Sequence, residues 1–376
     1  MQKKYEWIGG PEELARMAER IRGEKMVGLD TEFVWDRTYY ARLGLVQIGL
    51  ADGTCFLVDA PGAGDLSPLG DLLADGGTTK ILHDAPQDLM ILRRATGVAA
   101  RNVFDTRLAA GFAGLASTIS LGKLLEELLG LKLEKAHTRA DWLARPLSEA
   151  ELEYAADDVL HLPRAAELLR ERARAAGTEA WMDEEMGGIE AAAPDDARAC
   201  DEAYLRIRAA GNLGGRQLAA LRELAGWRER EARRADLPRR WVMEDGELVG
   251  LAMALPADLA GGGIDARKAK RYGEELLEAI GRAKALPDSA FPPPVFKAGR
   301  DAETKKALDD AMEAIRRRAE GFGMDPALVC SRGDAARLLQ EGLAARPEEH
   351  ALLRGWRGEF VRGASAFPVR GRDVLF

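Results

Sequence analysis

The chain has 376 residues, of which 47% are hydrophobic and 31% are charged. This composition is ordinary for a folded protein of two or three domains, and it excludes wholesale disorder. The 54 basic residues are outnumbered by 62 acidic residues, which gives a net charge of −8, so any surface that attracts nucleic acid must be local.

The sequence predicts neither a membrane span nor a signal peptide. It has no run of about 18 apolar residues, and the lysines near its N-terminus are not followed by an apolar stretch. The cysteines Cys55, Cys200 and Cys330 are isolated and cannot form a disulfide framework or a four-ligand zinc site. We therefore expect a cytoplasmic protein without a membrane partner.

The first block of the chain covers residues 1–185 and mixes strands with helices. Its short apolar runs bounded by turn residues predict strands, and its longer periodic stretches predict helices. The strands are expected at residues 26–33, 44–50, 55–59 and 79–83, and the helices at 120–129 and 148–175. Because the strands come first, the pattern favours a mixed β-sheet covered by helices.

Two helical blocks follow. Residues 181–200 are rich in glycine, alanine and acids and are predicted to be a linker, and residues 200–286 have a purely helical pattern. Residues 286–299 carry four prolines and must be extended or turning, because proline lacks the amide donor that a helix needs. Residues 300–376 form the third block, which is again helical.

Two acids interrupt an otherwise apolar predicted strand. Asp30 and Glu32 are two residues apart, so both side chains point to the same face of the strand. A buried carboxylate is costly and two neighbouring ones repel each other, so a cationic group is expected to compensate them. The alternative for such a pair alone is a solvated strand end.

A tyrosine and an acid share one face of a predicted helix. Ser148 and Glu151 form a capping-box pattern that sets the start of this helix, and Pro163 is expected to kink it. Tyr154 and Asp158 are four residues apart and therefore lie on the same face. An exposed tyrosine beside an exposed acid is the alternative.

A third acid lies at the start of another predicted helix. The strand at 79–83 ends in a turn, after which Asp84 is a natural N-cap and Pro86 is tolerated in the first turn. Asp88 falls in this first turn and becomes a further candidate for a site. The alternative is an acid placed there only because the helix dipole favours it.

Together these residues make a set of four carboxylates and a phenol within one mixed domain. Hard divalent cations such as Mg²⁺ or Mn²⁺ prefer oxygen ligands of this kind, and imidazoles such as His83 and His161 are uncommon in such sites. Two ions held about 3.5–4 Å apart can activate a water and stabilise the leaving oxygen in phosphodiester hydrolysis.

In this order and spacing, the residues resemble the DEDDy branch of the 3′→5′ exonucleases and, within it, the ribonuclease D family. The matching segments are VGLDTEF (27–33), LGLVQIGL (43–50), ILHDAPQDLMIL (81–92), NVFDTRLAAGFAG (102–114), SLGKLLEELLGLKLEK (120–135), DWLARPLS (141–148) and YAADDVLHL (154–162).

The resemblance implies an RNase H-like exonuclease domain at residues 1–185. It implies Asp30, Glu32, Asp88 and Asp158 as ligands of two divalent ions, Mg²⁺ or Mn²⁺, and Tyr154 as the residue that orients the attacking water. Since an unperturbed tyrosine titrates near 10, orientation through the hydroxyl is favoured over deprotonation.

The helical blocks resemble nucleic-acid-binding modules. Residues 200–286 look like an HRDC domain, and residues 300–376 resemble, more weakly, a second HRDC-like module. The apolar Leu221, Leu224, Trp227 and Leu248 are expected in the core. The arginines of the first module, among acids, suit either a solvated helical surface with ion pairs or contacts to phosphates.

The resulting hypothesis is a metal-dependent 3′→5′ exoribonuclease that trims RNA with a single-stranded 3′ end, such as tRNA precursors, and releases nucleoside 5′-monophosphates. The same chemistry on DNA, as in the Werner-type exonuclease domain, is an alternative. A second alternative is a non-catalytic RNA-binding scaffold, which the intact five-residue set argues against.

Overall fold

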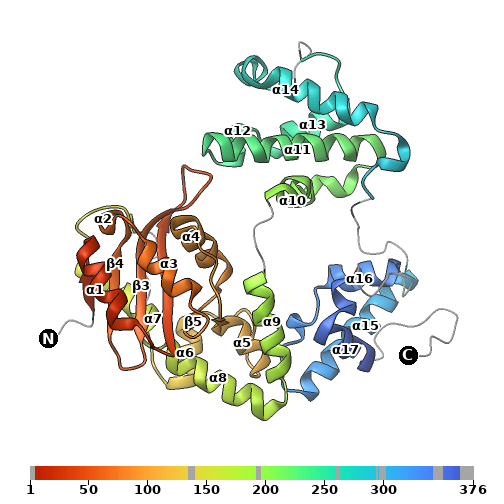
Figure 1. The fold of residues 1–376 in the computed structure, drawn as a ribbon. Coiled ribbons are helices and arrows are strands. Elements are labelled where there is room, and N and C mark those ends of the chain that lie inside the picture. The colour runs from red at the N-terminus through yellow and green to blue at the C-terminus, as the bar shows by residue number, and fades with distance from the viewer. Residues whose placement is uncertain are drawn as a thin grey trace. The chain divides into compact units, whose positions relative to one another are not determined.

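The computed structural model describes residues 5–133, 140–191, 196–259, 263–293, 295, 302–341 and 350–364. The chain divides into two compact units, and Figure 1 shows a sheet-containing part and an all-helical part. The first unit contains Met1–Val34, Arg42–Ala193 and Ala298–Phe376, and the second contains Trp35–Ala41 and Pro194–Lys297. The short segment Trp35–Ala41 therefore belongs to the helical unit, although it connects two strands of the sheet.

The first unit is built on a six-stranded mixed sheet in the order β1-β4-β3-β2-β5-β6. Its strands are β1 (Glu6–Ile8), β2 (Met26–Val34), β3 (Arg42–Leu50), β4 (Cys55–Asp59), β5 (Thr79–Leu82) and β6 (Val103–Asp105). The central strands β2, β3 and β4 are antiparallel neighbours, whereas β1, β5 and β6 are added in parallel. The predicted mixed sheet is confirmed, with the two three-residue strands β1 and β6 in addition.

The two faces of this sheet differ in character. On β2 and β3 the buried Leu29 and Ile48 oppose each other and belong to the main apolar core, together with residues of α1 (Pro11–Ile21) and α3 (Ser67–Ala74). Because side chains alternate along a strand, Asp30 and its register partner Gln47 lie on the opposite face. That face is the one that α7 (Glu149–Leu160) approaches.

The helices predicted for this unit are present: α4 (Pro86–Thr96), α6 (Leu121–Leu129), and α7 with α8 (Leu162–Ala176). In addition to α1 and α3, the structure also has helices before residue 192 that were not predicted: α2 (Ala60–Ala63), α5 (Thr106–Phe112) and α9 (Glu179–Ala191). The capping box of Ser148 and Glu151 starts α7 as expected, and the helix breaks before Pro163, so that α7 and α8 are separate. The described part of the predicted linker at 181–200 is helical, in α9 and α10 (Asp196–Asp201), and the boundary between the two units, at Ala193 and Pro194, falls within this range.

The helices α15 (Ala302–Gly321), α16 (Arg332–Glu341) and α17 (Gly355–Gly363) group with the first unit because α17 packs against α9. The rings of Trp181 and Trp356 are stacked at 5.8 Å, and Trp356 is 2% exposed. The Glu185 carboxylate accepts hydrogen bonds from Trp356 Nε1 (2.7 Å) and Arg357 Nη2 (2.9 Å). This aromatic and ionic contact explains why the composition of residues 181–191 did not predict their structure. That residues 300–376 form an HRDC-like module stays a prediction.

The second unit is a helical bundle. It contains α11 (Gly215–Ala235), α12 (Arg239–Val242), α13 (Asp245–Ala254) and α14 (Ala266–Ala285), preceded by α10 and two short 3₁₀ turns. The residues predicted for its core are buried: Leu221, Leu224, Trp227 and Leu248. Within the part of the chain that the structure describes, no helix is both long and apolar enough to cross a membrane.

Candidate active site

The central strand β2 carries two acids at the middle of the sheet. Asp30 lies opposite Gln47 and Glu32 opposite Leu45, and a β-bulge follows directly after Glu32. Gln47 is fully buried, and neither of its amide atoms has a hydrogen-bond partner among the described residues. Both acids are partly buried, and desolvation raises the pKa of each, so the alternative of a fully solvated strand end does not apply.

A pair of glycines allows α7 to approach this face of the sheet closely. Gly28 and Gly49 are register partners on β2 and β3. A Cβ atom at Gly28 would lie 2.5 Å, and one at Gly49 2.6 Å, from the carbonyl oxygen of Val159. Only glycine fits at such distances, and the close contact brings the neighbouring Asp158 to the acids of β2.

The third acid is held at the start of α4. The carboxylate of Asp105 accepts hydrogen bonds from the backbone amides of Asp84 (3.1 Å) and Ala85 (2.9 Å), which fixes the chain where the helix begins. Asp88 is 7% exposed and accepts a hydrogen bond from Thr31 Oγ1 of β2.

The expectation that Asp84 caps α4 is wrong. Ala85 occupies the N-cap position, and Asp84 has a positive φ of 69° and forms an ion pair with Arg107. The backbone amides at the start of α4 instead donate to the carboxylate of Asp105, which ends β6, a strand that the sequence did not predict. No local spacing links a residue at position 105 to a helix at position 86, so only the fold reveals this role.

The structure brings the predicted carboxylates together. Ligand oxygens of Asp30, Glu32 and Asp158 all lie within 4.8 Å of one another. Asp88 is close enough that its charge acts on Asp30 and Glu32. Among the described residues, none of these four carboxylates forms an ion pair with a lysine or arginine. The cationic group that the sequence led us to expect is therefore not a side chain of the described residues.

Burial raises the pKa of every member of this cluster, and repulsion by the other members adds to it for Asp30 and Glu32. Desolvation, followed by the charges of Asp88, Asp158 and Glu32, raises the pKa of Asp30 well above its usual range. Desolvation and the same kind of repulsion raise the pKa of Glu32 to about 8, and desolvation raises that of Asp158 to about 7. The pKa of Asp88 is also raised by burial, against the lowering effect of its hydrogen bond from Thr31.

Tyr154 stands beside the cluster, as its spacing predicted. Its hydroxyl is hydrogen-bonded to Asp158, and its ring is stacked on Trp142 at 6.2 Å. Burial, then the charges of Asp158 and Glu32, raise the pKa of Tyr154, so the phenol stays protonated. A protonated phenol can donate and accept hydrogen bonds, which suits a role in orienting a water.

His83, which ends the predicted strand before Asp88, has its ring nitrogens engaged elsewhere. The ring nitrogens of His83 are 3.0 Å from Thr106 Oγ1 and 3.1 Å from the carbonyl oxygen of Ile119. Both nitrogens therefore have protein partners.

These residues fit divalent metal ions. The donors are all carboxylate oxygens, which Mg²⁺ and Mn²⁺ prefer. Within the described part of the chain no cationic side chain compensates their charges, and the buried amide of Gln47, which has no partner there, lies opposite Asp30. A cation of charge +2 would relieve the repulsion and restore the ionised state of the four acids.

Comparison with known proteins agrees with this geometry. A family model described as "3'-5' exonuclease" matches residues 5–173, and one described as "HRDC domain" matches residues 217–280. With the RNase H-like mixed sheet and the acidic cluster, these matches define a 3′→5′ exonuclease with a helical C-terminal region that includes an HRDC domain.

Relatives of known name identify the family. The chain is 37% identical over 363 residues to ribonuclease D of Desulfotalea psychrophila, covering 96% of this chain and 97% of the relative. It is 34% identical over 371 residues to ribonuclease D of Escherichia coli K12, again covering 96% and 97%. The crystal structure of Escherichia coli RNase D, described as "an exoribonuclease involved in structured RNA processing", superposes with a TM-score of 0.83 at 32% identity, over 96% of this chain and 97% of that one. The chain belongs to the ribonuclease D family and is an exoribonuclease.

The glycine pair supplies a test of how Asp158 is placed. We expect Gly49→Ala to push α7 away from the sheet and to lower exonuclease activity by at least about tenfold, with a loss of stability of about 1–3 kcal/mol, as for other overpacked sites. Gly187→Ala is the matched control, because Gly187 lies on α9 with no atom near its missing Cβ. Initial rates and urea unfolding compare the two variants. Equal activity in both would show that the close approach is not needed.

The raised pKa values predict how stability depends on pH in the metal-free protein. The folded state retains protons on these acids above pH about 4, where the unfolded chain has lost them, so their contribution to stability falls as pH rises toward 8. Asp30→Asn removes one of these charges. We expect its free energy of unfolding in EDTA to exceed that of the wild type by a margin that grows by about 1–2 kcal/mol from pH 5 to pH 8. Urea titrations at both values measure it, and a margin independent of pH would contradict the repulsion.

Proposed function

We propose that this protein hydrolyses the terminal phosphodiester bond at RNA 3′ ends and releases nucleoside 5′-monophosphates. The observation that supports this most directly is the cluster of Asp30, Glu32 and Asp158, with Asp88 beside it and no cationic side chain among the described residues to neutralise it. Asp30, Glu32, Asp88 and Asp158 would hold two divalent ions, Mg²⁺ or Mn²⁺. When bound, such a pair lowers the pKa of a water and stabilises the charge that develops on the leaving oxygen.

Tyr154 is the candidate for positioning the attacking water. Its hydroxyl is anchored to Asp158 and its ring to Trp142, so its position is fixed by two contacts. We propose that this hydroxyl orients the attacking water next to the scissile phosphate. Because burial and the neighbouring acids raise its pKa, the phenolate is disfavoured, and general base catalysis by Tyr154 itself is not part of the proposal.

The proposed substrate is RNA with a single-stranded 3′ end, such as a tRNA precursor or another structured RNA. The relative of known structure is described as acting in structured RNA processing, and it matches this chain over nearly its whole length, including the helical region. The Werner-type alternative, in which the same site acts on DNA, is tested together with the main proposal below.

The direct test uses RNA and DNA oligonucleotides of the same sequence, labelled at the 5′ or the 3′ end, with and without Mg²⁺ or Mn²⁺. We expect 5′-labelled RNA to shorten stepwise, 3′-labelled RNA to give a labelled mononucleotide at once, and EDTA to stop both reactions. Asp158→Asn should abolish hydrolysis, whereas Asp157→Asn, the neighbouring acid outside the cluster, should retain it. Hydrolysis by Asp158→Asn would contradict the assignment, and a preference for DNA would favour the alternative substrate.

Tyr154→Phe separates water orientation from metal binding. The variant removes one hydroxyl and no carboxylate, and the phenylalanine ring can still stack on Trp142. We expect kcat to fall by about 10²–10⁴-fold, as for a positioned acid–base group, while KM and the metal concentration for half-maximal activity stay within about threefold. Normal kcat would make Tyr154 a packing residue.

A further inference from the structure

The connection between β2 and β3 is built into the helical unit. Trp35–Ala41 begins three residues after Glu32 in the chain, yet it groups with residues 194–297. The segment is folded on itself, because Trp35 Nε1 donates to the Tyr39 carbonyl oxygen at 2.7 Å and Thr38 Oγ1 donates to the Tyr40 carbonyl oxygen at 2.6 Å. The Tyr40 amide donates to Asp236 Oδ1 at the end of α11 (3.0 Å).

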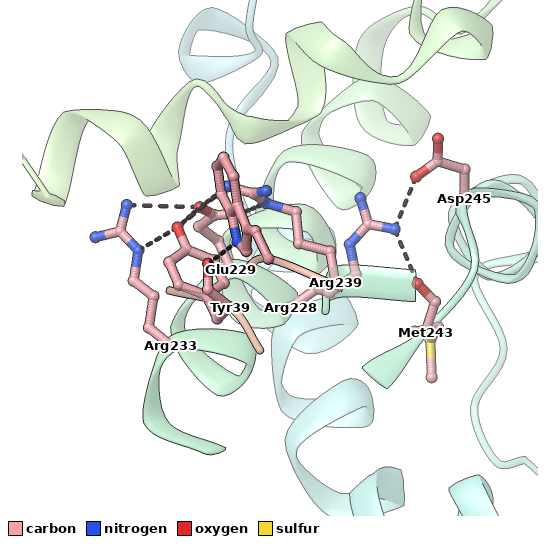
Figure 2. A network of polar contacts seen from close by, with 8 residues as sticks. Tyr39, Arg228, Glu229, Arg233, Arg239, Met243 and Asp245 are labelled. Carbon is pink, nitrogen blue, oxygen red and sulfur yellow. Dashed lines mark hydrogen bonds and ion pairs between the residues drawn. The ribbon is translucent and has the colours of Figure 1, made fainter. Parts of the chain in front are cut away.

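A buried acid of α11 anchors this segment. Glu229 is 2% exposed and accepts a hydrogen bond from the hydroxyl of Tyr39, as Figure 2 shows. Arg239 binds both oxygens of the same carboxylate, through Nε at 2.5 Å and Nη2 at 2.8 Å. Arg233 Nε and Arg239 Nη2 also donate to the Tyr39 hydroxyl, at 2.9 and 3.1 Å. The two guanidinium groups lie 5.6 and 4.8 Å from the centre of the Tyr39 ring.

This network fixes the wall of a surface hollow. Burial alone would raise the pKa of Glu229, but the hydrogen bonds from Arg239 and Tyr39 and the nearby positive charges outweigh it, and the net pKa is lowered. The acid therefore stays ionised. The guanidinium groups of Arg233 and Arg239 both donate hydrogen bonds to Glu229 and to the Tyr39 hydroxyl. The side chains are pre-organised, so a ligand that binds beside them does not have to order them.

The hollow has a volume of about 320 Å³ and is lined by the indole of Trp35, which donates to the Tyr39 carbonyl oxygen, and by the guanidinium of Arg240. Its lining includes Trp35, Tyr39, Pro238, Arg239 and Arg240. Trp35 is 43% exposed. Arg240 is exposed, and no ion pair of its side chain is found among the described residues. The acid of the lining, Asp36, has Arg37 within 3.4 Å.

We propose that this hollow is a binding subsite for single-stranded RNA, with a base stacked on Trp35 and a phosphate bound by Arg240. The inference rests on the proposed function, because it adds a contact for the same substrate. An exposed aromatic ring beside an arginine is typical of proteins that bind single-stranded nucleic acid without sequence preference. Any base can stack on the ring, and the guanidinium can donate hydrogen bonds to two phosphate oxygens. A chain of net charge −8 needs such a local basic surface to hold RNA.

The test measures binding of a fluorescein-labelled 12-nucleotide RNA to the full-length protein in EDTA, where hydrolysis is stopped. We expect Trp35→Ala to weaken binding by about 5- to 100-fold, the span for one stacked base, and Trp35→Phe to restore most of it. Arg240→Gln should weaken binding and flatten the log–log salt dependence by about 0.7, and Arg240→Lys should restore the slope. In hydrolysis with Mn²⁺, KM should rise while kcat at saturating RNA stays within about twofold.

Two matched controls lie outside the hollow on the same unit. Trp241 is 51% exposed and Arg267 of α14 is exposed, and neither lines the hollow. We expect Trp241→Ala and Arg267→Gln to bind RNA within about twofold of the wild type. Unchanged binding by the Trp35 and Arg240 variants, or an equal loss in the controls, would overturn the subsite.

The two proposals fail in different ways. If the wild type hydrolyses RNA and the Trp35 and Arg240 variants bind it normally, the subsite is wrong and the proposed function stands. If the wild type binds RNA through the hollow but hydrolyses none, the proposed function is wrong and the subsite stands. Circular dichroism and thermal melts of each variant exclude misfolding as the cause, which is a small risk for side chains as exposed as these.

Discussion

The structure of the candidate active site depends on one unfavourable interaction, the confinement of several carboxylates in a partly desolvated environment. Desolvation raises the pKa of Asp30, Glu32, Asp88 and Asp158, and the charges of the neighbouring acids raise it further for Asp30 and Glu32. None of the four has a cationic side chain as a partner in the described structure. A folded chain tolerates such a cluster only if the rest of the domain holds it in place. A site that is unstable without a cation is, for the same reason, one that binds divalent cations strongly.

Three structural features hold the acids in place despite this repulsion: strand pairing, a pair of glycines and hydrogen bonds to backbone amides. The antiparallel pairing with β3 fixes Asp30 and Glu32 opposite Gln47 and Leu45. The glycine pair of β2 and β3 lets the backbone of α7 come within reach of β2, which places Asp158 and, one turn earlier, Tyr154. The carboxylate of Asp105 fixes the backbone at the start of α4, which carries the fourth acid. In each case it is the backbone that is held in place, and the position of the backbone sets the position of the acidic side chain.

The sequence predicted most of the sheet and the five candidate residues, because strand alternation and helical spacing report which side chains share a face. The sequence did not predict the features that depend on contacts between residues distant in the chain. The strands β1 and β6 have three residues each and no periodicity to detect. Residues 181–191 have the composition of a linker but form a helix because Trp181 packs against the distant Trp356. The anchor between Tyr39 and Glu229 joins residues 190 positions apart, and neither residue has a local signal. The roles of the four acids and of Tyr154 stay predictions until they are measured.

Direct counting of bound Mn²⁺ tests the account most closely. Electron paramagnetic resonance of free Mn²⁺ during a titration of the wild-type protein at pH 7.5 gives the number of ions per chain, independently of any substrate. We expect the wild type to bind two ions, and Asp30→Asn to bind fewer ions or to bind them much more weakly. We also expect an affinity that falls as the pH drops below about 7, where protons compete for the acids. No binding above that of the Asp30→Asn variant, or binding independent of pH, would contradict the claim that these carboxylates exist to hold cations.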